Sequence, residues 1–195
     1  MILLGISGKK RSGKDTICGF IKDIVNGMPE YTFAHINFAD ALYEEVACAL
    51  WPAIHRDNKA ALNRKIETIK ADKDSFRTLL QWWGTDWRRK FFDEHYWINK
   101  WAAKIRLAPE NAIVVCSDVR FLNELQAVRG CKGYAWRVSR PNLELSDLHS
   151  SEIDLDNRHD WDDSITNDVT LNILQLRVEK QFQALLTKHN NTQLK

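Results

Sequence analysis

The segment from Gly8 to Thr16, Gly-Lys-Lys-Arg-Ser-Gly-Lys-Asp-Thr, constrains the fold of this 195-residue chain more than any other. A short apolar run, Met1 to Leu4, precedes it, and apolar residues at 17, 20, 21, 24 and 25 follow at helical spacing. A strand, a glycine-rich loop and a helix in this order are typical of a phosphate-binding loop with the pattern G-x-x-x-x-G-K. The sequence therefore predicts an α/β protein, with a parallel sheet flanked by helices, that binds a nucleotide.

The residue types of this loop suit the binding of phosphate. Glycines at 8 and 13 allow the backbone N–H groups to approach phosphate oxygens closely, and the following helix adds the positive end of its dipole. The lysine at 14 is expected to reach the β- and γ-phosphates. We expect nucleotide contacts from Gly8, Lys10, Arg11, Ser12, Gly13, Lys14, Asp15 and Thr16.

One position of the loop departs from the common pattern. Asp15 follows Lys14, where the common loop has Ser or Thr as a ligand of Mg²⁺, and Thr16 comes one place later. A carboxylate is also a good Mg²⁺ ligand, directly or through water. The alternative is that Asp15 only stabilises the first turn of the helix.

The composition gives no indication of a nucleic-acid-binding protein or a membrane protein. The formal net charge of +2 gives no reason to expect nucleic acid or an anionic membrane as the partner, and no apolar stretch approaches the length of about 20 residues that a membrane helix needs. We expect a single cytoplasmic domain in a reducing compartment. The four cysteines form no C-x-x-C pair and are expected to be small buried hydrophobic side chains: Cys18, Cys48, Cys116 and Cys131.

Two carboxylates follow predicted strands, where open α/β sheets bind their ligands. Asp40 follows a predicted strand over 31–38 and is a candidate for the acceptor site, or the N-cap of the next helix. Asp118 follows the continuous apolar run Ala112 to Cys116, which predicts a strand buried on both faces. Asp118 is a candidate Mg²⁺ carboxylate or general base, and Arg120 a candidate phosphate contact.

The middle of the chain is helical and rich in tryptophan. Residues 51–74 predict a loop and a solvated helix, whereas 75–101 combine tryptophans at helical core spacing with basic residues. Core packing is the expectation for most of these tryptophans, and a platform for single-stranded nucleic acid is the alternative. Gly84 and the pair Arg88-Arg89 suggest close approach to a small anionic ligand.

The last third predicts a strand, a polar segment and a final helix. The strand covers Tyr134 to Val138 and the helix about 171–186. The polar segment of about 140–163 suits a mobile lid that closes over the nucleotide, with Arg140 or Arg158 reaching the transferred phosphate.

Together these segments resemble the phage deoxynucleoside monophosphate kinase family, whose fold is related to that of other small-molecule kinases with a phosphate-binding loop. The resemblance covers most of the chain and includes the Asp-Thr ending of the loop. Four positions differ from the family pattern: Leu122 replaces Pro, Tyr43 replaces Lys, and Arg88 and Val169 each replace Gly. The later segments follow in the family's order: Phe38-Ala39-Asp40, Gly84–Trp87, Ser117–Phe121 with Asn123-Glu124, His149 with Ser151-Glu152, and Asn167-Asp168.

The resemblance implies transfer of the ATP γ-phosphoryl group to a deoxynucleoside monophosphate, with Mg²⁺ at Asp15 and Asp118. It implies a helical acceptor-binding region over about 40–110, and Asn167 and Asp168 beneath the donor adenine. The implied catalytic residues are Lys14, Arg11, Asp118 and Arg120. The implied substrate-binding residues are Lys10, Asp40, Trp87, Arg88, Arg120, Glu124, His149 and Glu152.

Other functions stay open at this point. A related kinase acting on dephospho-coenzyme A or phosphomevalonate would use the same donor site. A regulator that only hydrolyses or senses ATP would need no acceptor. Apolar surface in the 51–110 region leaves a homodimer open, and a small-molecule deoxynucleotide is the expected partner.

Overall fold

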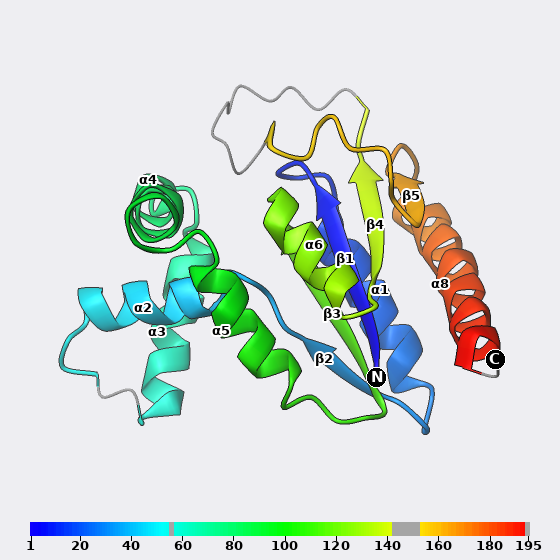
Figure 1. The fold of residues 1–195 in the computed structure, drawn as a ribbon, viewed down its shortest axis with the longest axis horizontal. Helices are drawn as coiled ribbons and strands as arrows, with labels where there is room; N and C mark the ends of the chain where they lie inside the picture. Colours follow the sequence, from blue (N-terminus) through cyan, green and yellow to red (C-terminus); the bar gives the residue numbers. More distant parts are fainter. Residues whose placement is uncertain (55–56, 142–152, 194–195) are drawn as a thin grey trace. The chain divides into compact units, whose positions relative to one another are not determined.

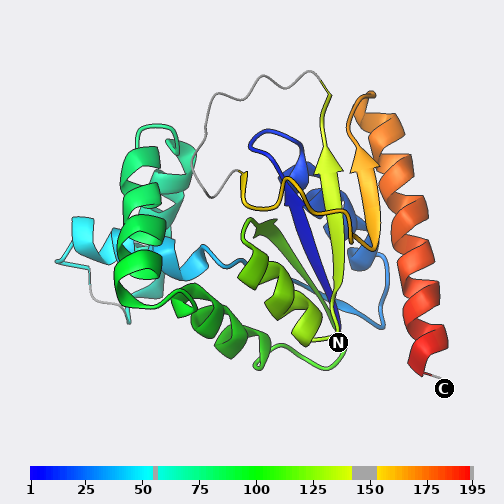
Figure 2. The ribbon, with the colours of Figure 1, turned by 45° about the horizontal axis from the view of Figure 1, so that its top comes forward.

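The computed structural model describes residues 1–54, 57–141 and 153–193. The chain divides into two compact units, each with its own packing. The sheet unit consists of Met1–Asn37 together with Ile105–Lys195, and the helical unit consists of Phe38–Lys104. Figure 1 shows both units, and Figure 2 shows the strands of the sheet unit from a second angle.

The sheet unit contains a five-stranded sheet in the order β2-β3-β1-β4-β5. Every neighbouring pair is parallel, so the carboxyl ends of all five strands meet at one edge. This is the α/β fold that the sequence predicts, of the type found in phosphate-loop kinases. The strands are β1 (Ile2–Gly8), β2 (Thr32–His35), β3 (Ala112–Val119), β4 (Tyr134–Ser139) and β5 (Asp163–Thr166).

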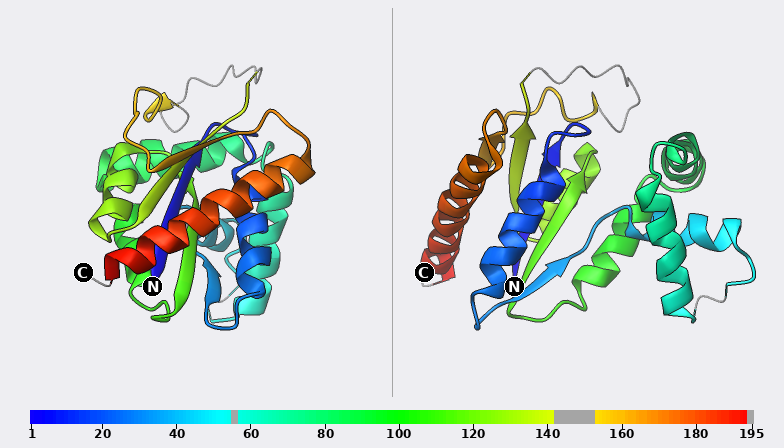
Figure 3. Two further views of the ribbon diagram at one scale, coloured as in Figure 1. Left: turned by 90° about the vertical axis from the view of Figure 1, so that its right-hand side faces the viewer. Right: turned by 180° about the vertical axis from the view of Figure 1, so that it is seen from behind.

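Helices cover both faces of this sheet (Figures 1 and 3). The helices α1 (Lys14–Asn26) and α8 (Leu171–Gln193) contact each other and share one core with alternate residues of β1. The helix α6 (Leu122–Gly130) contacts β1 and β4. All seven residues of β1 are buried, as expected of a strand covered on both faces.

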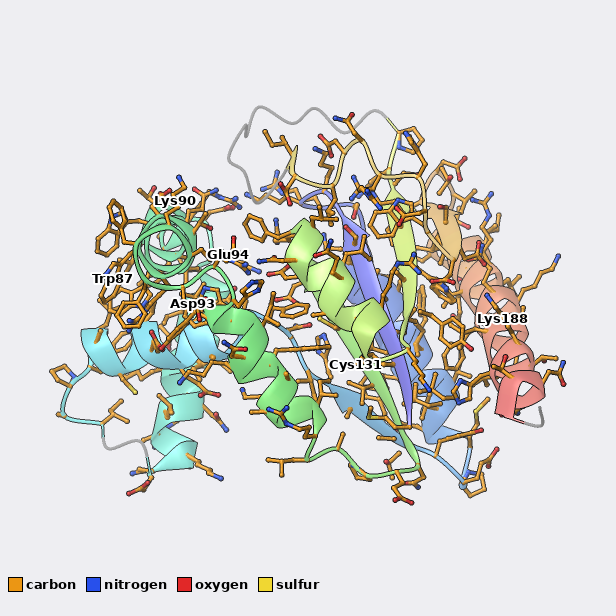
Figure 4. All side chains as sticks on the ribbon, in the orientation of Figure 1. Trp87, Lys90, Asp93, Glu94, Cys131 and Lys188 are labelled. Atoms are coloured by element: carbon orange, nitrogen blue, oxygen red, sulfur yellow. The ribbon has the colours of Figure 1, made fainter. Side chains whose placement is uncertain are left out.

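Two elements near the C-terminus differ from the sequence-based prediction. No strand is predicted between the polar segment and the final helix, and Asp163–Thr166 forms the edge strand β5 beside β4. Helix α8 continues to Gln193, past the predicted end near 186. Its added turns are tied to the sheet, because the Tyr134 hydroxyl lies 3.4 Å from His189 Nδ1 and the Lys188 ammonium lies 5.4 Å from the Tyr134 ring centroid (Lys188 is labelled in Figure 4).

The cysteines do not share one environment. Cys18 and Cys116 are buried, and burial raises the pKa of the Cys18 thiol to about 12. Cys131, labelled in Figure 4 at the turn after α6, is exposed, so the expectation that all four are buried is wrong at this position. The sequence pattern could not distinguish the buried cysteines from the exposed one. Cys131 is exposed because it lies in the turn that follows the end of α6 at Gly130.

The helical unit contains α2 (Asp40–Leu50), α3 (Lys59–Ala71), α4 (Arg77–Gln81), a π-helix η1 (Trp82–Phe92) and α5 (Tyr96–Ile105). Helices α2, α3 and α4 share one core. The loop and solvated helix predicted for 51–74 correspond in part to α3, but one side of this helix is not solvated, since Leu62, Ile66 and Ile69 are buried against α2. Among the described residues, no helix combines the length and hydropathy needed to cross a membrane.

The tryptophans of the helical unit divide into two groups. Trp97 and Trp101 are buried, which confirms core packing for these two, and Trp101 stacks on Phe38 with ring centroids 4.5 Å apart. Trp82 is half exposed and stacks on Trp87 at 5.7 Å. These two residues are five apart, which is the spacing of backbone hydrogen bonds in a π-helix.

Candidate active site

The phosphate-binding loop lies at the carboxyl edge of the sheet, between β1 and α1. The Lys14 ammonium donates hydrogen bonds to the carbonyl oxygens of Gly8 (2.7 Å) and Lys9 (2.8 Å), and Lys14 is only 8% exposed. The Ser12 N–H also donates to the Lys9 carbonyl (3.2 Å). The loop is therefore closed around a nearly buried ammonium group.

Two glycines allow this loop to pack closely against neighbouring strands. Gly13 has a φ of 105°, and a Cβ atom there would lie 2.5 Å from Asn167 Nδ2. A Cβ atom on Gly8 would lie 2.5 Å from the Val138 carbonyl oxygen. Larger residues at these positions would push the loop away from β4 and from the segment after β5.

Asn167 holds the loop from the far side. Its Nδ2 donates to the Ser12 carbonyl (2.9 Å), and its backbone N–H donates to the Ser139 carbonyl (2.8 Å). The neighbouring Asp168 accepts a hydrogen bond from Arg177 of α8 (2.7 Å). The predicted contact of Asn167 and Asp168 with the adenine stays a prediction, and Asn167 has a defined role in supporting the loop.

The loop fits a phosphate group by a further criterion. Ser12 is 1% exposed, and its hydroxyl oxygen is one of three buried side-chain N or O atoms without a hydrogen-bond partner among the described residues. A buried hydroxyl normally has a partner, and a phosphate oxygen in the loop would supply one. Together with the close backbone, this atom indicates that the loop is built to hold an anion.

Asp15 is oriented by a hydrogen-bonded chain that starts on β2. The Ser117 hydroxyl donates to Asp15 Oδ1 (3.1 Å) and lies 2.9 Å from His35 Nε2. A hydroxyl has one hydrogen and a carboxylate only accepts, so His35 must carry its proton on Nε2 and donate it to Ser117. Asn37 Oδ1 accepts from the Ser117 backbone N–H (2.8 Å) and fixes the end of β3.

Two carboxylates, Asp15 and Asp118, are the candidate Mg²⁺ ligands at this edge of the sheet. In residues 1–54, 57–141 and 153–193, no three His, Cys, Asp or Glu side chains converge on one point. Asp118, at the end of β3, accepts from the Cys116 thiol through Oδ1 (3.2 Å). Mg²⁺ characteristically uses one or two carboxylates plus substrate phosphates, and Asp15 and Asp118 fit this donor set.

Glu124 is buried, and its carboxylate accepts hydrogen bonds from backbone N–H groups. It is 2% exposed, and its Oε2 accepts from the backbone N–H groups of Arg120 (2.8 Å) and Phe121 (3.1 Å) at the start of α6. These bonds fix the turn that carries Arg120 past the end of β3. A substrate contact for Glu124 stays a prediction.

The remaining predicted residues of the sheet unit lie along the same edge. Arg11 has a φ of 62° and accepts a hydrogen bond on its carbonyl from Arg140 (3.4 Å). Lys10 precedes it in the loop, and Thr16 lies in the first turn of α1. The predicted substrate residues His149 and Glu152 fall outside the described residues, as does the part of the expected lid from 142 to 152.

In the helical unit, Arg88 lies in an aromatic and acidic setting. Its guanidinium lies 4.2 Å from the Trp87 ring centroid and 4.8 Å from that of Tyr96. Glu45 of α2 accepts from Arg88 Nε (3.0 Å), Trp83 Nε1 (3.2 Å) and the Tyr96 hydroxyl. Figure 4 shows Trp87 on the coil of η1, and Asp40 is the first residue of α2.

Glu45→Gln is expected to destabilise the helical unit. The Glu45 and Arg88 side chains are 11% and 17% exposed, and an amide would place N–H groups against donors and leave a buried charge unpaired. The expected loss in the free energy of unfolding is about 3 kcal/mol. Urea unfolding followed by tryptophan fluorescence measures it.

The neighbouring Glu44→Gln is the matched control. Glu44 is 46% exposed and pairs with Lys104 (2.9 Å) in solvent, so the expected loss is below about 1 kcal/mol. Equal losses in the two variants would contradict the role given to Glu45.

Several residues of these sites could not be selected from the sequence. His35, Asn37 and Glu45 act through partners far away in the chain, and nothing in their local pattern distinguishes them. Arg137 did carry a signal, because it is a cation inside the apolar pattern of β4, opposite Ser7 in the register with β1. Arg137, Lys9 and Asp156 form an ion cluster beside the loop.

Comparison with known proteins agrees with this architecture. The family model described as deoxynucleotide monophosphate kinase matches residues 50–178, more than half of the chain. A protein of Acanthamoeba polyphaga mimivirus named "Putative deoxynucleotide monophosphate kinase" is 28% identical over 186 residues, covering 88% of this chain and 91% of its own. The deoxynucleotide monophosphate kinase of Escherichia phage RB69 is 31% identical over 122 residues, covering 62% of this chain and 49% of its own. The chain therefore belongs to the deoxynucleotide monophosphate kinase family.

Proposed function

We propose that this protein transfers the γ-phosphoryl group of Mg-ATP to the 5′-phosphate of a deoxynucleoside monophosphate, giving the diphosphate and ADP. The observation that carries the proposal is the loop itself. Its lysine ammonium bridges two loop carbonyls, and the buried Ser12 hydroxyl has no partner among the described residues. Membership of the family supports a deoxynucleotide as the acceptor.

On the donor side, catalysis requires positioning and the neutralisation of spreading negative charge more than covalent chemistry. The loop N–H groups hold the phosphates, and Lys14 turns from the Gly8 and Lys9 carbonyls toward the β- and γ-oxygens. Asn167 keeps the loop backbone in place through the Ser12 carbonyl. Lys10 and Arg11 add positive charge beside the transferred group.

A divalent ion is expected at Asp15 and Asp118. When bound, Mg²⁺ neutralises phosphate charge and fixes the geometry of the triphosphate. The chain's own contribution is orientation. The Ser117 hydroxyl, itself bonded to His35, donates to one oxygen of Asp15, and the Cys116 thiol donates to one oxygen of Asp118.

On the acceptor side, Arg120 and the helical unit supply the candidate contacts. Asp40 and Trp87 are proposed to position the sugar and base of the monophosphate. The ion pair with Glu45 fixes the guanidinium of Arg88, so Arg88 is proposed to offer its remaining N–H groups in a set direction.

The acceptor is identified by ADP release from Mg-ATP in the presence of single candidate acceptors. The panel contains dGMP, dTMP, dCMP, dAMP, their ribose counterparts, dephospho-coenzyme A and phosphomevalonate. The proposal predicts turnover with one or a few deoxynucleotides. Turnover only with a non-nucleotide would transfer the proposal to another acceptor, and equal ADP release without an acceptor would contradict phosphoryl transfer.

A further inference from the structure

A cluster of opposite charges lies at the carboxyl ends of β1 and β4. Arg137 stands opposite Ser7 in the register of these strands, and its Nη1 donates to the Ser7 hydroxyl (2.9 Å). Its Nη2 donates to Asp156 Oδ1 (3.2 Å), and the Lys9 ammonium donates to the other oxygen of the same carboxylate. One carboxylate therefore serves two cations.

The setting of Arg137 is unusually protected for a charged group. Its side chain is 20% exposed, and the Trp161 ring centroid lies 5.5 Å from the guanidinium carbon. Burial lowers the pKa of Arg137, and Asp156 acts in the opposite direction. A partly buried cation is stabilised by an anion beside it, and the Asp156 carboxylate supplies negative charge to both Arg137 and Lys9.

The cluster is continuous with the phosphate-binding loop. Lys9 follows Gly8, and its carbonyl accepts the Lys14 ammonium and the Ser12 N–H, so its backbone is part of the loop. Figures 1 and 2 show the segment after residue 152, in yellow-orange, passing the carboxyl ends of β1 and β4. Ligands of parallel α/β sheets bind at this edge.

Asp156 is not needed to attach its own segment. Two residues earlier, Asp154 Oδ2 accepts from the Leu122 N–H at the start of α6 (2.7 Å). Further on, Asp162 Oδ2 accepts from the Ala135 N–H of β4 (2.9 Å). The segment is thus anchored on both sides of Asp156, and the Asp156 carboxylate can leave its cations without detaching the segment.

We propose that Lys9 and Arg137 form a subsite for a phosphoryl group, and that the Asp156 carboxylate occupies this subsite until a phosphate displaces it. A phosphate offers more charge and more acceptor oxygens than a carboxylate, and guanidinium binds it in a bidentate manner. This inference rests on the proposed function, because it takes the bound phosphoryl group to belong to a nucleotide. The same chemistry is offered by the terminal phosphate of the donor and by the phosphate of the acceptor.

The test is the affinity of the full chain for three probes: ATP, tripolyphosphate and a deoxynucleoside monophosphate, each alone in a calorimeter. Asp156→Asn keeps the shape of the side chain and removes the competing charge, so about tenfold tighter binding of at least one probe is expected. Asp160→Asn is the matched control, because it removes the same charge from the same segment. Asp160 pairs with Arg158 (2.7 Å), not with the cluster, and little change is expected.

The double variant Lys9→Met with Asp156→Asn is expected to lose most of this gain, because one of the two cations is gone. A gain with ATP and tripolyphosphate assigns the subsite to the donor, and a gain with the monophosphate alone assigns it to the acceptor. The proposal would be overturned if the Asp156→Asn variant bound none of the three probes more tightly than the Asp160→Asn variant does. Binding is measured without turnover, so a chain that shows the gain but phosphorylates no deoxynucleotide would contradict the proposed function and leave the subsite standing.

Discussion

Lys14→Ala is expected to lower phosphoryl transfer by on the order of 10²–10³-fold, the usual cost of removing one preorganised contact to a transition-state charge. The Lys14 ammonium is bonded within the loop, to the Gly8 and Lys9 carbonyls. An alanine supplies neither the charge nor the reach. The measurement is ADP release with the best acceptor of the panel, at saturating ATP.

The control for this variant is Lys22→Ala. Lys22 lies on the exposed side of the same helix α1, so it changes the net charge equally and leaves the loop alone. Both variants are expected to keep the far-UV circular dichroism of the unchanged chain. Full activity in Lys14→Ala would remove the loop from the mechanism.

Gly13→Ala is expected to abolish tight nucleotide binding and to destabilise the sheet unit. An alanine at a φ of 105° is strained by about 1–2 kcal/mol. Its Cβ atom would also lie 2.5 Å from Asn167 Nδ2 and would break the bond from Asn167 to the Ser12 carbonyl. Urea unfolding and ATP calorimetry measure the two effects.

Gly19→Ala offers a matched comparison within α1. A Cβ atom on Gly19 would meet no atom within 4 Å, and Gly19 lies inside the helix. The expected result is a gain of about 0.5–1 kcal/mol in the free energy of unfolding, with unchanged ATP affinity. If Gly13→Ala bound ATP with the affinity of the unchanged chain, the requirement for glycine at this position of the loop would be contradicted.

The elements around the phosphate loop could be predicted because each carries a local pattern. The glycine spacing of 8–16 and the unbroken apolar run of 112–116 specify the loop and β3 without reference to distant residues. The edge strand β5 has four residues and gains its definition from β4, so no local pattern distinguished it. The same applies to the last turns of α8, which depend on Tyr134.

The residues of the candidate site also fall into two groups: those with a local sequence pattern and those defined by distant partners. Lys14 and Asp15 followed from motif position. Ser117 became visible only through its hydrogen bond to Asp15, and His35 only through its hydrogen bond to Ser117. In the helical unit, the pattern indicated a functional arginine at 88, and packing supplied its partner, Glu45. The π-helical repeat of η1 could not be expected, because an α-helical spacing fits the same tryptophans.

The most direct test of the central claim follows the phosphoryl group itself. The full chain is incubated with ATP labelled on the γ-phosphate and the preferred deoxynucleoside monophosphate, and the products are separated. The account predicts that the label appears in the deoxynucleoside diphosphate, in equal amount to the ADP formed. Label found only as inorganic phosphate, with the monophosphate unchanged, would contradict it.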